Sequence, residues 1–308
     1  MAATCPICES GAVSYCCSSR DRRKGLAGEW PFWECASCGL LFQHPMPTVP
    51  QLLSYYAGYS TDDEVRLALA AGSRGERLRR WYHRLSGDVD PRDFIPVSAG
   101  TRVLDFGCGA APYLRYFRAR GAHISGAEIA PAVVTACRGA GLDVVLIEDL
   151  DRIPFADGEF DVVYLMQVIE HIARPHQFLA ELRRVLKPAG EVYLAMPNAR
   201  SVWRRVFGAD WVAGWFAPFH VFVYGVPAIR ALAQAHRFQV VRSWSITPDS
   251  WLRLNLKAAL YRGNNRLDAA PRTWLDLPLV RLPLALLLRL AEALIRERDC
   301  LVVHLKKC

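Results

Sequence analysis

Short apolar runs alternate with amphipathic stretches through residues 101–200. The runs hold four to six apolar residues, as in "RVLDFG" from Arg102, and the stretches between them are ten to fifteen residues long. Continuous apolar runs are typical of parallel strands buried on both faces, and amphipathic stretches of that length are typical of the crossover helices that cover them. The pattern therefore predicts an α/β fold with a largely parallel sheet.

Changes in composition divide the chain into three parts. Residues 1–47 contain short turns and two cysteine pairs, and they close on the proline-rich "HPMPTVP". Residues 48–97 have a helical pattern and then the polar linker "GDVDPRDFIP", which together predict a helical connector. The α/β pattern occupies residues 98–308, and "DCLVVHLKK" at residues 299–307 is the predicted last strand. Residues 251–298 are therefore predicted to form a helical insertion before that strand.

The insertion contains an apolar stretch, "PLALLLRLAEALIRER", at residues 283–298. It predicts an amphipathic helix with Pro283 in its first turn. At 100° per residue, Arg289, Glu292 and Arg296 fall within about 60° of one another and leave a wide apolar face. The helix is too short and too charged to span a membrane. Three placements stay open: buried in the protein, between two copies of the chain, or at a membrane interface.

The stretch "VLDFGCGAA" leads from an apolar strand into a turn of small residues. Gly107 and Gly109 let the backbone turn sharply and approach a ligand closely. Glu128 ends the next strand, about twenty residues on, where a carboxylate can bind ribose hydroxyls. Asp105, two residues before the first glycine, suits a cationic ligand better than a phosphorylated one. These residues predict a nucleoside ligand, and they favour S-adenosylmethionine over a nicotinamide cofactor.

A longer set of motifs follows in order through residues 100–245. It comprises "VLDFGCGAA", "GAEIAP" and "EDLDRIPFADGEFDVVYLMQVIEHIARPHQFLAELRRVLKPAGEVYLAMPN". This set resembles the class I S-adenosylmethionine-dependent methyltransferases. The resemblance implies a Rossmann-like sheet and methyl transfer from S-adenosylmethionine. The alternative is a generic Rossmann-like domain in which the glycines only form turns and the acids lie at the surface.

The resemblance also implies roles for individual residues in cofactor binding. Three would surround the methionine part of the cofactor: Asp105, Gly107 and Gly109. Glu128 would hold the ribose, Asp149 would meet the adenine amino group, and Leu150 would lie beside the adenine ring. Gln167, after the fourth strand, would lie near the sulfonium. The sequence departs from the family at Ala111, where a further glycine is common.

Two Cys-x-x-Cys pairs predict a zinc ribbon at the N-terminus. Four thiolates at this spacing can enclose a tetrahedral zinc ion, and Gly39 relieves backbone crowding after the second pair. Because the protein would fill all four positions, the zinc would be structural. Cys16 and Cys17 are adjacent and are interpreted as packing or surface thiols. The predicted zinc ligands are Cys5, Cys8, Cys35 and Cys38.

The layout of "CPIC", "CASCGLLFQHPMPT" and "LLSYYAGY" resembles a bacterial subgroup of sugar- and polysaccharide-modifying methyltransferases. It implies methyl transfer to a sugar nucleotide, a glycan or a lipid-linked precursor. Some ribosomal RNA methyltransferases also have an N-terminal zinc ribbon, but residues 1–47 have no net charge, which disfavours a nucleic acid partner. RNA methylation, quinone-type methylation and a binding module without turnover stay open as alternatives.

Two histidines are candidates for removing a proton from the acceptor. His171, in "IEH", follows the fourth strand, and His220 lies in the aromatic stretch "WFAPFHVFVYG". A base at either position could reach an acceptor beside the cofactor. For both, a role in packing, or for His171 in helix capping, is at least as good an interpretation as a catalytic or acceptor-binding role. The sequence does not choose between O, N and C methylation.

Charge and tryptophan collect at the C-terminal end. The chain has a net charge of +8, and residues 201–308 alone have sixteen basic and seven acidic residues. Residues 201–298 are thus predicted to form a basic, aromatic cap, which fits a small anionic acceptor and contact with a membrane surface. No signal-peptide pattern precedes the cysteines, so we expect a cytoplasmic protein, with contact at the inner face of the membrane as an option. The oligomeric state stays open.

Overall fold

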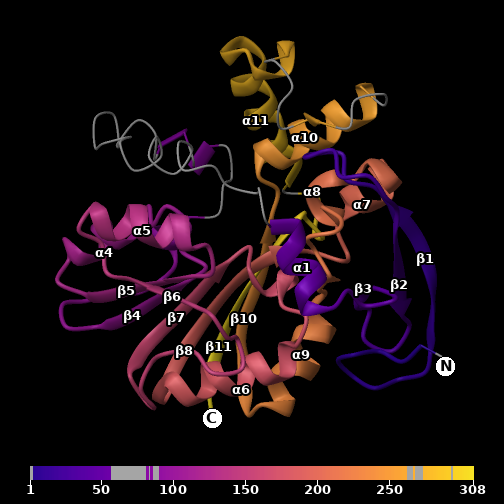
Figure 1. Cartoon of the computed structure of the whole chain (residues 1–308). Helices are drawn as coiled ribbons and strands as arrows, with labels where there is room; N and C mark the ends of the chain where they lie inside the picture. Colours follow the sequence, from indigo (N-terminus) through magenta and orange to yellow (C-terminus); the bar gives the residue numbers. More distant parts are fainter. Residues whose placement is uncertain are drawn as a thin grey trace.

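Two β-sheets organise the protein (Figure 1). The structure is a computed structural model that describes residues 3–56, 81–82, 84–85, 90–261, 266–267, 273–292 and 294–308. The predicted helical connector begins with α1 (Val49–Tyr56) and includes the short 3-10 helix η1 (Pro91–Asp93). Its central part, residues 57–80, lies outside the described residues.

The larger sheet has seven strands in the order β10-β11-β8-β7-β4-β5-β6. Its strands are β4 (Arg102–Phe106), β5 (His123–Glu128), β6 (Val144–Leu146), β7 (Phe160–Met166), β8 (Leu186–Pro197), β10 (Phe238–Ile246) and β11 (Cys300–Lys307). Strands β4 to β8 pair in parallel, whereas β11 runs antiparallel to both β8 and β10. The predicted Rossmann-like α/β fold and the predicted last strand are confirmed.

Helices cover both faces of this sheet (Figure 1). They are α4 (Leu114–Arg118) and α5 (Pro131–Gly139) on one face, and α6 (Pro175–Val185) and α9 (Val226–Ala235) on the other. Alternation along β4 explains the two layers, because Val103 packs in the cluster with α4 and α5 while Leu104 packs in the cluster with α6 and α9. Both clusters are buried, as expected for a parallel sheet.

The amphipathic pattern of "HQFLAELRRVLKPAG" is typical of a helix along its whole length, but α6 ends at Val185 and β8 begins at Leu186. Pro188 explains the earlier end. A proline has no N–H for the helix, and it drives the residue before it into an extended conformation. The rest of the apolar run therefore continues as strand.

The smaller sheet has the order β1-β2-β3-β9. The N-terminal residues supply β1 (Val13–Ser19), β2 (Trp30–Cys35) and β3 (Leu41–Gln43). The fourth strand, β9 (Phe222–Val223), comes from far downstream and pairs antiparallel with β3. The N-terminal sheet is thus completed by the α/β part of the chain, and nothing in the sequence pattern predicts this pairing.

A helical insertion lies between β10 and β11. It contains α10 (Asp249–Leu260), the 3-10 helix η5 (Trp274–Asp276) and α11 (Pro278–Glu292). We expected Pro283 in the first turn, but the helix begins five residues earlier, and Pro283 lies in its interior. A capping box at Thr273 and Asp276 begins the 3-10 helix η5, and Pro278 is the first residue of α11, a position where its missing N–H costs no hydrogen bond.

Short helices connect the strands on the C-terminal side of the sheet. They are η2 (Ile169–His171), α7 (Val202–Phe207), η3 (Gly208–Asp210) and α8 (Val212–Trp215). Among the helices in the described ranges, none has both the length and the apolar character needed to cross a bilayer.

Candidate functional site

The loop after β4 is shaped by a close contact with the loop after β7. Gly107 has φ +74°, and a Cβ there would lie 2.4 Å from Cγ2 of Val168. The neighbouring loop therefore requires a residue without a side chain at position 107, in addition to any space that a ligand needs. Gly109 has φ +50° but no atom within 4 Å of its Cβ direction, so its requirement is the backbone conformation. Ala111 also has positive φ, at 50°, where the family commonly has glycine.

Asp105, the last residue but one of β4, lies beside the hydroxyl of Tyr164 and has one carboxyl oxygen without a hydrogen-bond partner. The residue is 3% exposed, and its Oδ2 has no hydrogen-bond partner in the described chain. Burial raises the pKa of this carboxyl to about 7. A buried carboxylate without a partner is costly unless a ligand supplies one. A cationic ligand at the end of β4 would do so.

Glu128 at the end of β5 is fully engaged by backbone amides. Its Oε2 accepts a hydrogen bond from Gly109 N at 3.0 Å. Its Oε1 accepts from Ile129 N at 2.8 Å and from Ala130 N at 3.1 Å. The carboxylate therefore ties the loop after β4 to the start of α5, and it lies at the edge where the resemblance places the ribose.

The remaining predicted cofactor residues lie at the carboxyl ends of β6 and β7. Asp149 is exposed and accepts a hydrogen bond from Asp151 N at 2.8 Å, while the partly buried Leu150 packs against the main core. Gln167 has φ +59°, and its side-chain amide contacts Cys300 Sγ at 3.4 Å. All seven predicted residues thus follow adjacent strands at one edge of the sheet.

The two predicted histidines meet, with ring centroids 4.7 Å apart. His171 Nδ1 lies 2.9 Å from the carbonyl oxygen of Phe219, and His220 Nδ1 lies 2.8 Å from that of Gly214. A carbonyl oxygen can only accept, so both Nδ1 atoms carry the proton. Each Nε2 is therefore the atom with a free lone pair. The hydroxyl of Tyr56 lies 2.7 Å from the same Nδ1 of His171.

Glu170 lies beside the two histidines, although no pattern in the sequence predicted it as a site residue. It is completely buried, and neither of its carboxyl oxygens has a hydrogen-bond partner in the part of the chain described. Oε1 lies 3.9 Å from Nε2 of His220. Burial raises the pKa of Glu170 to about 8 and lowers the pKa of His171 to about 4. The only signal in the sequence was its place beside His171.

Glu170, His171 and His220 form one compact group, which we call the Glu-His-His group. Each offers a ligand atom within 4.8 Å of the other two. Such a group can exchange a proton with an acceptor, and its donor set could also hold a divalent cation. Because Glu170 and His220 are buried and His171 is partly buried, any charge that develops there acts in a medium of reduced dielectric constant.

Aromatic rings surround the Glu-His-His group. The ring of Tyr56 lies 6.0 Å from His171 and 5.2 Å from Phe219, measured between centroids. Phe216 stacks on Phe219 at 4.7 Å, and the guanidinium carbon of Arg23 lies 4.0 Å from the centre of the Phe216 ring. The site therefore combines flat apolar surfaces with titratable groups, a combination suited to a planar acceptor.

Gln43 at the end of β3 holds the segment that carries His220. It is 1% exposed, and its side-chain amide donates to the carbonyl oxygens of Pro218 at 2.9 Å and His220 at 2.8 Å. Its backbone N–H donates to Val221 O, and Val221 N–H donates to Glu170 O, both at 2.9 Å. The N-terminal sheet and the Glu-His-His group are thus joined through one short segment.

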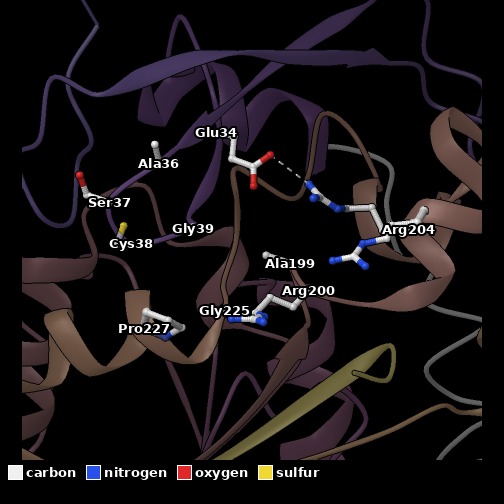
Figure 2. A pocket seen from close by; sticks show the side chains of 11 residues that line it. Glu34, Ala36, Ser37, Cys38, Gly39, Ala199, Arg200, Arg204, Gly225 and Pro227 are labelled. Carbon is white, nitrogen blue, oxygen red and sulfur yellow. Dashed lines mark ion pairs between the residues drawn. The ribbon is translucent and has the colours of Figure 1, made fainter. Parts of the chain in front are cut away.

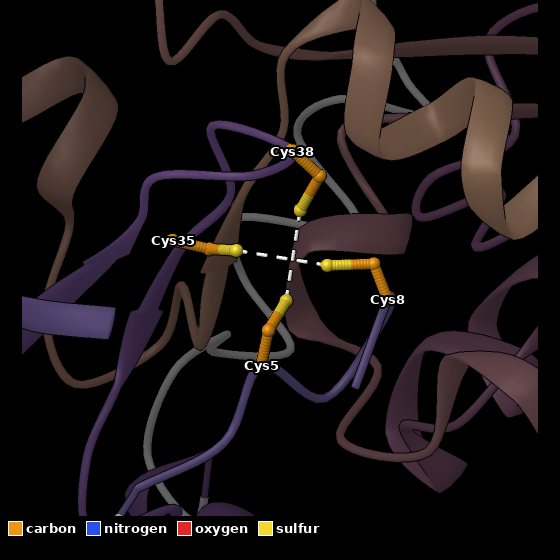
Figure 3. A group of neighbouring side chains, drawn as sticks. All are labelled: Cys5, Cys8, Cys35 and Cys38. Carbon is orange, nitrogen blue, oxygen red and sulfur yellow. Dashed lines mark hydrogen bonds between the residues drawn. The ribbon is translucent and has the colours of Figure 1, made fainter. Parts of the chain in front are cut away.

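The four predicted zinc ligands converge (Figure 3). Cys5 Sγ and Cys38 Sγ are 3.6 Å apart, as are Cys8 Sγ and Cys35 Sγ. Zn–S bonds of about 2.3 Å in a tetrahedron separate the sulfur atoms by about 3.8 Å, so the thiols have the spacing of a zinc site. Cys16 and Cys17 lie in β1 and pack against a separate apolar cluster.

A polar pocket of about 320 Å³ lies between the second cysteine turn and the chain after β8 (Figure 2). Arg200, Arg204 and Arg205 line it. Arg204 faces Glu34 at 3.6 Å, and Arg200 faces Glu297 at 3.2 Å. A zinc ion with four thiolates would add a further net negative charge beside it. The arginine charges are therefore balanced locally.

Comparison with known proteins agrees with this geometry. A family model described as methyltransferase domain matches residues 104–194. The chain is 36% identical over 124 residues to a ubiquinone biosynthesis O-methyltransferase of Maricaulis maris, covering 38% of this chain and 49% of the relative. It is 30% identical over 159 residues to the protein of that name in Dechloromonas aromatica, covering 45% and 67%. The chain belongs to the class I S-adenosylmethionine-dependent methyltransferases.

The sequence similarity to known methyltransferases covers part of this chain and part of each relative. The chain spans about half the length of the first curated relatives it matches. Among solved structures, the [4+2]-cyclase SpnF is similar with a TM-score of 0.50 and 19% identity, covering 85% of this chain and 97% of that one. At this identity the likeness shows the fold alone. Similarity of fold therefore does not show which acceptor this chain methylates.

The role of Gln43 in this methyltransferase can be measured by replacing it with methionine, which keeps the volume and removes the amide. We expect Gln43→Met to lower the free energy of unfolding by about 2 to 4 kcal/mol, because two buried carbonyl oxygens lose their donor. Denaturant unfolding provides the measurement. Gln239→Met, at an exposed position of β10, is the matched control and should change stability by less than about 0.5 kcal/mol. Equal stability of the two variants would refute the role of Gln43.

Proposed function

We propose that this protein transfers the methyl group of S-adenosylmethionine to a hydroxyl group of a small quinone-type acceptor with an aromatic ring. The observation that carries the proposal is the Glu-His-His group, buried among aromatic rings and joined to the cofactor loop through the contact between Gly107 and Val168. The curated relatives, which are named ubiquinone biosynthesis O-methyltransferases, support this quinone alternative better than the sugar nucleotide, glycan or lipid-linked acceptor expected from the N-terminal layout.

The unpaired carboxyl oxygen of Asp105 supports S-adenosylmethionine as the ligand of the sheet edge. The ammonium of the methionine part would provide the hydrogen-bond donor and the positive charge that Oδ2 of Asp105 lacks. Glu128, Asp149 and Gln167 stand at the strand ends where ribose, adenine and sulfonium are expected. When bound, S-adenosylmethionine supplies an electrophilic methyl group. The remaining contributions come from the chain itself.

The Glu-His-His group would accept the proton of the acceptor hydroxyl. Nε2 of His171 has a free lone pair, and its ring is held by the Phe219 carbonyl through Nδ1–H. As the proton moves from the acceptor oxygen to Nε2, the imidazole becomes cationic, and Glu170 would offset that charge in molecules where its carboxyl is already ionised. Methyl transfer is an in-line displacement, so the aromatic rings would contribute by holding the acceptor in line with the methyl group.

The four N-terminal thiols would hold one structural zinc ion. This proposal rests on the sulfur spacing and on the position of Gly39, whose N–H donates to Cys35 O at 2.8 Å with φ +68°. A tetrahedral site with four protein ligands has no open position for water, so the metal would stabilise the ribbon and take no part in methyl transfer. The predicted cytoplasmic location, where thiols stay reduced, belongs to the same proposal.

Metal analysis tests the zinc proposal. We expect one zinc per chain, lost in Cys35→Ser and retained in the control Cys16→Ser. Acid should release the metal because protonation competes for the thiolates, and the ribbon should lose on the order of 10 kcal/mol of stabilisation. A wild-type protein without zinc, or full zinc occupancy in Cys35→Ser, would contradict the proposal.

Cofactor affinity should depend on pH through Asp105. The pKa of about 7 in the free protein means that the carboxyl is protonated at lower pH, whereas an ammonium binds the ionised form. Affinity for S-adenosylmethionine should therefore fall about tenfold for each pH unit below about 7. Asp105→Asn should weaken binding by about 1.5 to 3 kcal/mol and flatten the profile. Calorimetry between about pH 6 and pH 8 measures both effects, and a flat wild-type profile would count against the assignment.

Turnover tests the chemistry. With methyl-labelled S-adenosylmethionine and a soluble dihydroxybenzoate as the acceptor, we expect a labelled O-methyl product. His171→Ala should lower kcat by about 10²- to 10⁴-fold while cofactor affinity changes little. His176→Ala is the matched control, because His176 pairs with His236 at 3.0 Å, outside the group. Failure of the wild type to methylate any aromatic hydroxyl, or full activity of His171→Ala, would overturn this mechanism.

A further inference from the structure

The helix α11 shows its apolar side to solvent. Five of its leucines, with one before it and one after it, form what we call the leucine stripe, and each is between 39% and 88% exposed. The stripe consists of Leu277, Leu279, Leu282, Leu286, Leu287, Leu290 and Leu294. Soluble monomers rarely expose an apolar patch of this extent, so the stripe indicates an interaction surface. Of the three placements that the sequence left open, burial is wrong for these leucines.

Helical geometry places the exposed leucines together. At 100° per residue, four of them lie within about 80° of one another: Leu279, Leu282, Leu286 and Leu290. Leu287 extends this face by about 60°. On the opposite side, Ala285 and Leu288 are buried. The helix thus buries a narrow apolar edge and leaves its wider one uncovered within the described chain.

The arginines of α11 turn toward the protein. Arg289 donates to the carbonyl oxygen of Thr247, and Arg281 donates to the hydroxyl of Tyr82. This is the reverse of an ordinary surface helix, in which the apolar side packs on the core and the charged side meets water. Because the polar side of α11 contacts the protein, the leucine stripe is left facing outward, where it can contact an apolar environment outside the protein.

The insertion that carries the stripe projects from the edge of the sheet where the cofactor residues lie. β10 ends at Ile246, opposite Cys300, and Cys300 pairs with Pro197 at the carboxyl end of β8. Gln167 contacts the same Cys300. Figure 1 shows α10 and α11 extending beyond this edge. The helix that carries the stripe therefore lies beyond the same edge of the sheet as the predicted cofactor residues.

The insertion that carries the stripe has more basic than acidic residues in its sequence, and it includes an exposed tryptophan. Residues 249–298 have nine basic and five acidic residues. Trp274, in the turn before α11, is 54% exposed, and Arg296 after the helix is exposed. Leucines combined with tryptophan and basic residues are typical of helices that lie in the interface of an anionic membrane. A contact between two copies would bring these like charges together.

We propose that the leucine stripe of α11 docks on the surface of an anionic lipid bilayer and holds the cofactor edge of the sheet toward it. The leucines enter the boundary between headgroups and acyl chains, while exposed basic residues such as Arg296 meet the anionic headgroups. Docking itself is independent of the acceptor. Docking would give the protein access to an acceptor that partitions into the bilayer, and this consequence rests on the proposed function.

Vesicle sedimentation tests the proposal. The wild type should pellet with phosphatidylcholine vesicles that contain phosphatidylserine at low salt, and much less with phosphatidylcholine alone or at high salt. The variant Leu286→Ser/Leu287→Ser/Leu290→Ser should bind at least about tenfold more weakly. Its melting temperature should stay close to that of the wild type, because these leucines are exposed. The control Val206→Ser/Val241→Ser replaces exposed valines on other elements and should bind like the wild type.

Three results would overturn the proposal. The first is wild type that stays in the supernatant with phosphatidylserine vesicles at low salt. The second is a triple variant that melts much earlier, which would make the stripe part of the core. The third is a wild-type dimer in analytical ultracentrifugation that the triple variant converts to a monomer, without vesicle binding by either protein. Loss of cofactor binding or turnover would instead refute the proposed function and leave vesicle binding unchanged.

Discussion

The buried amide of Gln43 connects the two sheets of this protein. It donates to the carbonyl oxygens of Pro218 and His220, which would otherwise be buried without a partner. Backbone bonds then run from Gln43 to Val221 and from Val221 to Glu170. Since an unpaired buried carbonyl costs about 1 to 3 kcal/mol, these bonds fix the segment in one position. The geometry of the Glu-His-His group therefore depends on the N-terminal sheet, although that sheet contributes none of its three residues.

The second constraint is steric. Gly107 and Val168 lie so close that any side chain at residue 107 would displace the loop after β7. This loop leads directly into η2, which carries Glu170 and His171. Because residue 107 has no side chain, the loop after β4 and the Glu-His-His group can lie next to each other. In methyl transfer, where alignment of donor and acceptor is the main task, such a fixed spacing is what the protein can contribute.

Asp105 and Glu170 are two of four buried acidic residues that have a carboxyl oxygen without a hydrogen-bond partner within the described chain; the other two are Asp249 and Asp299. Asp105 and Glu170 both have raised pKa values because burial disfavours their charged forms. Oδ2 of Asp105 and both carboxyl oxygens of Glu170 are the atoms without partners. Groups of this kind destabilise a fold unless something else pairs with them. Their positions, at the end of β4 and just after β7, coincide with the places proposed for the cofactor's ammonium and for the acceptor's proton.

The sequence by itself determined the elements whose signals are local. Apolar runs predicted the parallel strands, the Cys-x-x-Cys spacing predicted the convergent thiols, and the glycines after β4 predicted the turn. The strands and the turn depend on residues close together in the chain, and the thiols are predicted because two closely spaced pairs together supply the four ligands of a known metal geometry.

Tertiary structure alone decided the features that join distant segments. The pairing of β3 with β9, the contact between His171 and His220, and the burial of Glu170 all arise from packing between parts of the chain far apart in sequence. The exposure of the leucines on α11 is of the same kind. Periodicity showed that the helix has an apolar side, but it could not show which side the arginines would anchor. The hydrophobic pattern of a segment shows which side chains could be buried. Only the tertiary structure shows whether another part of the protein packs against them.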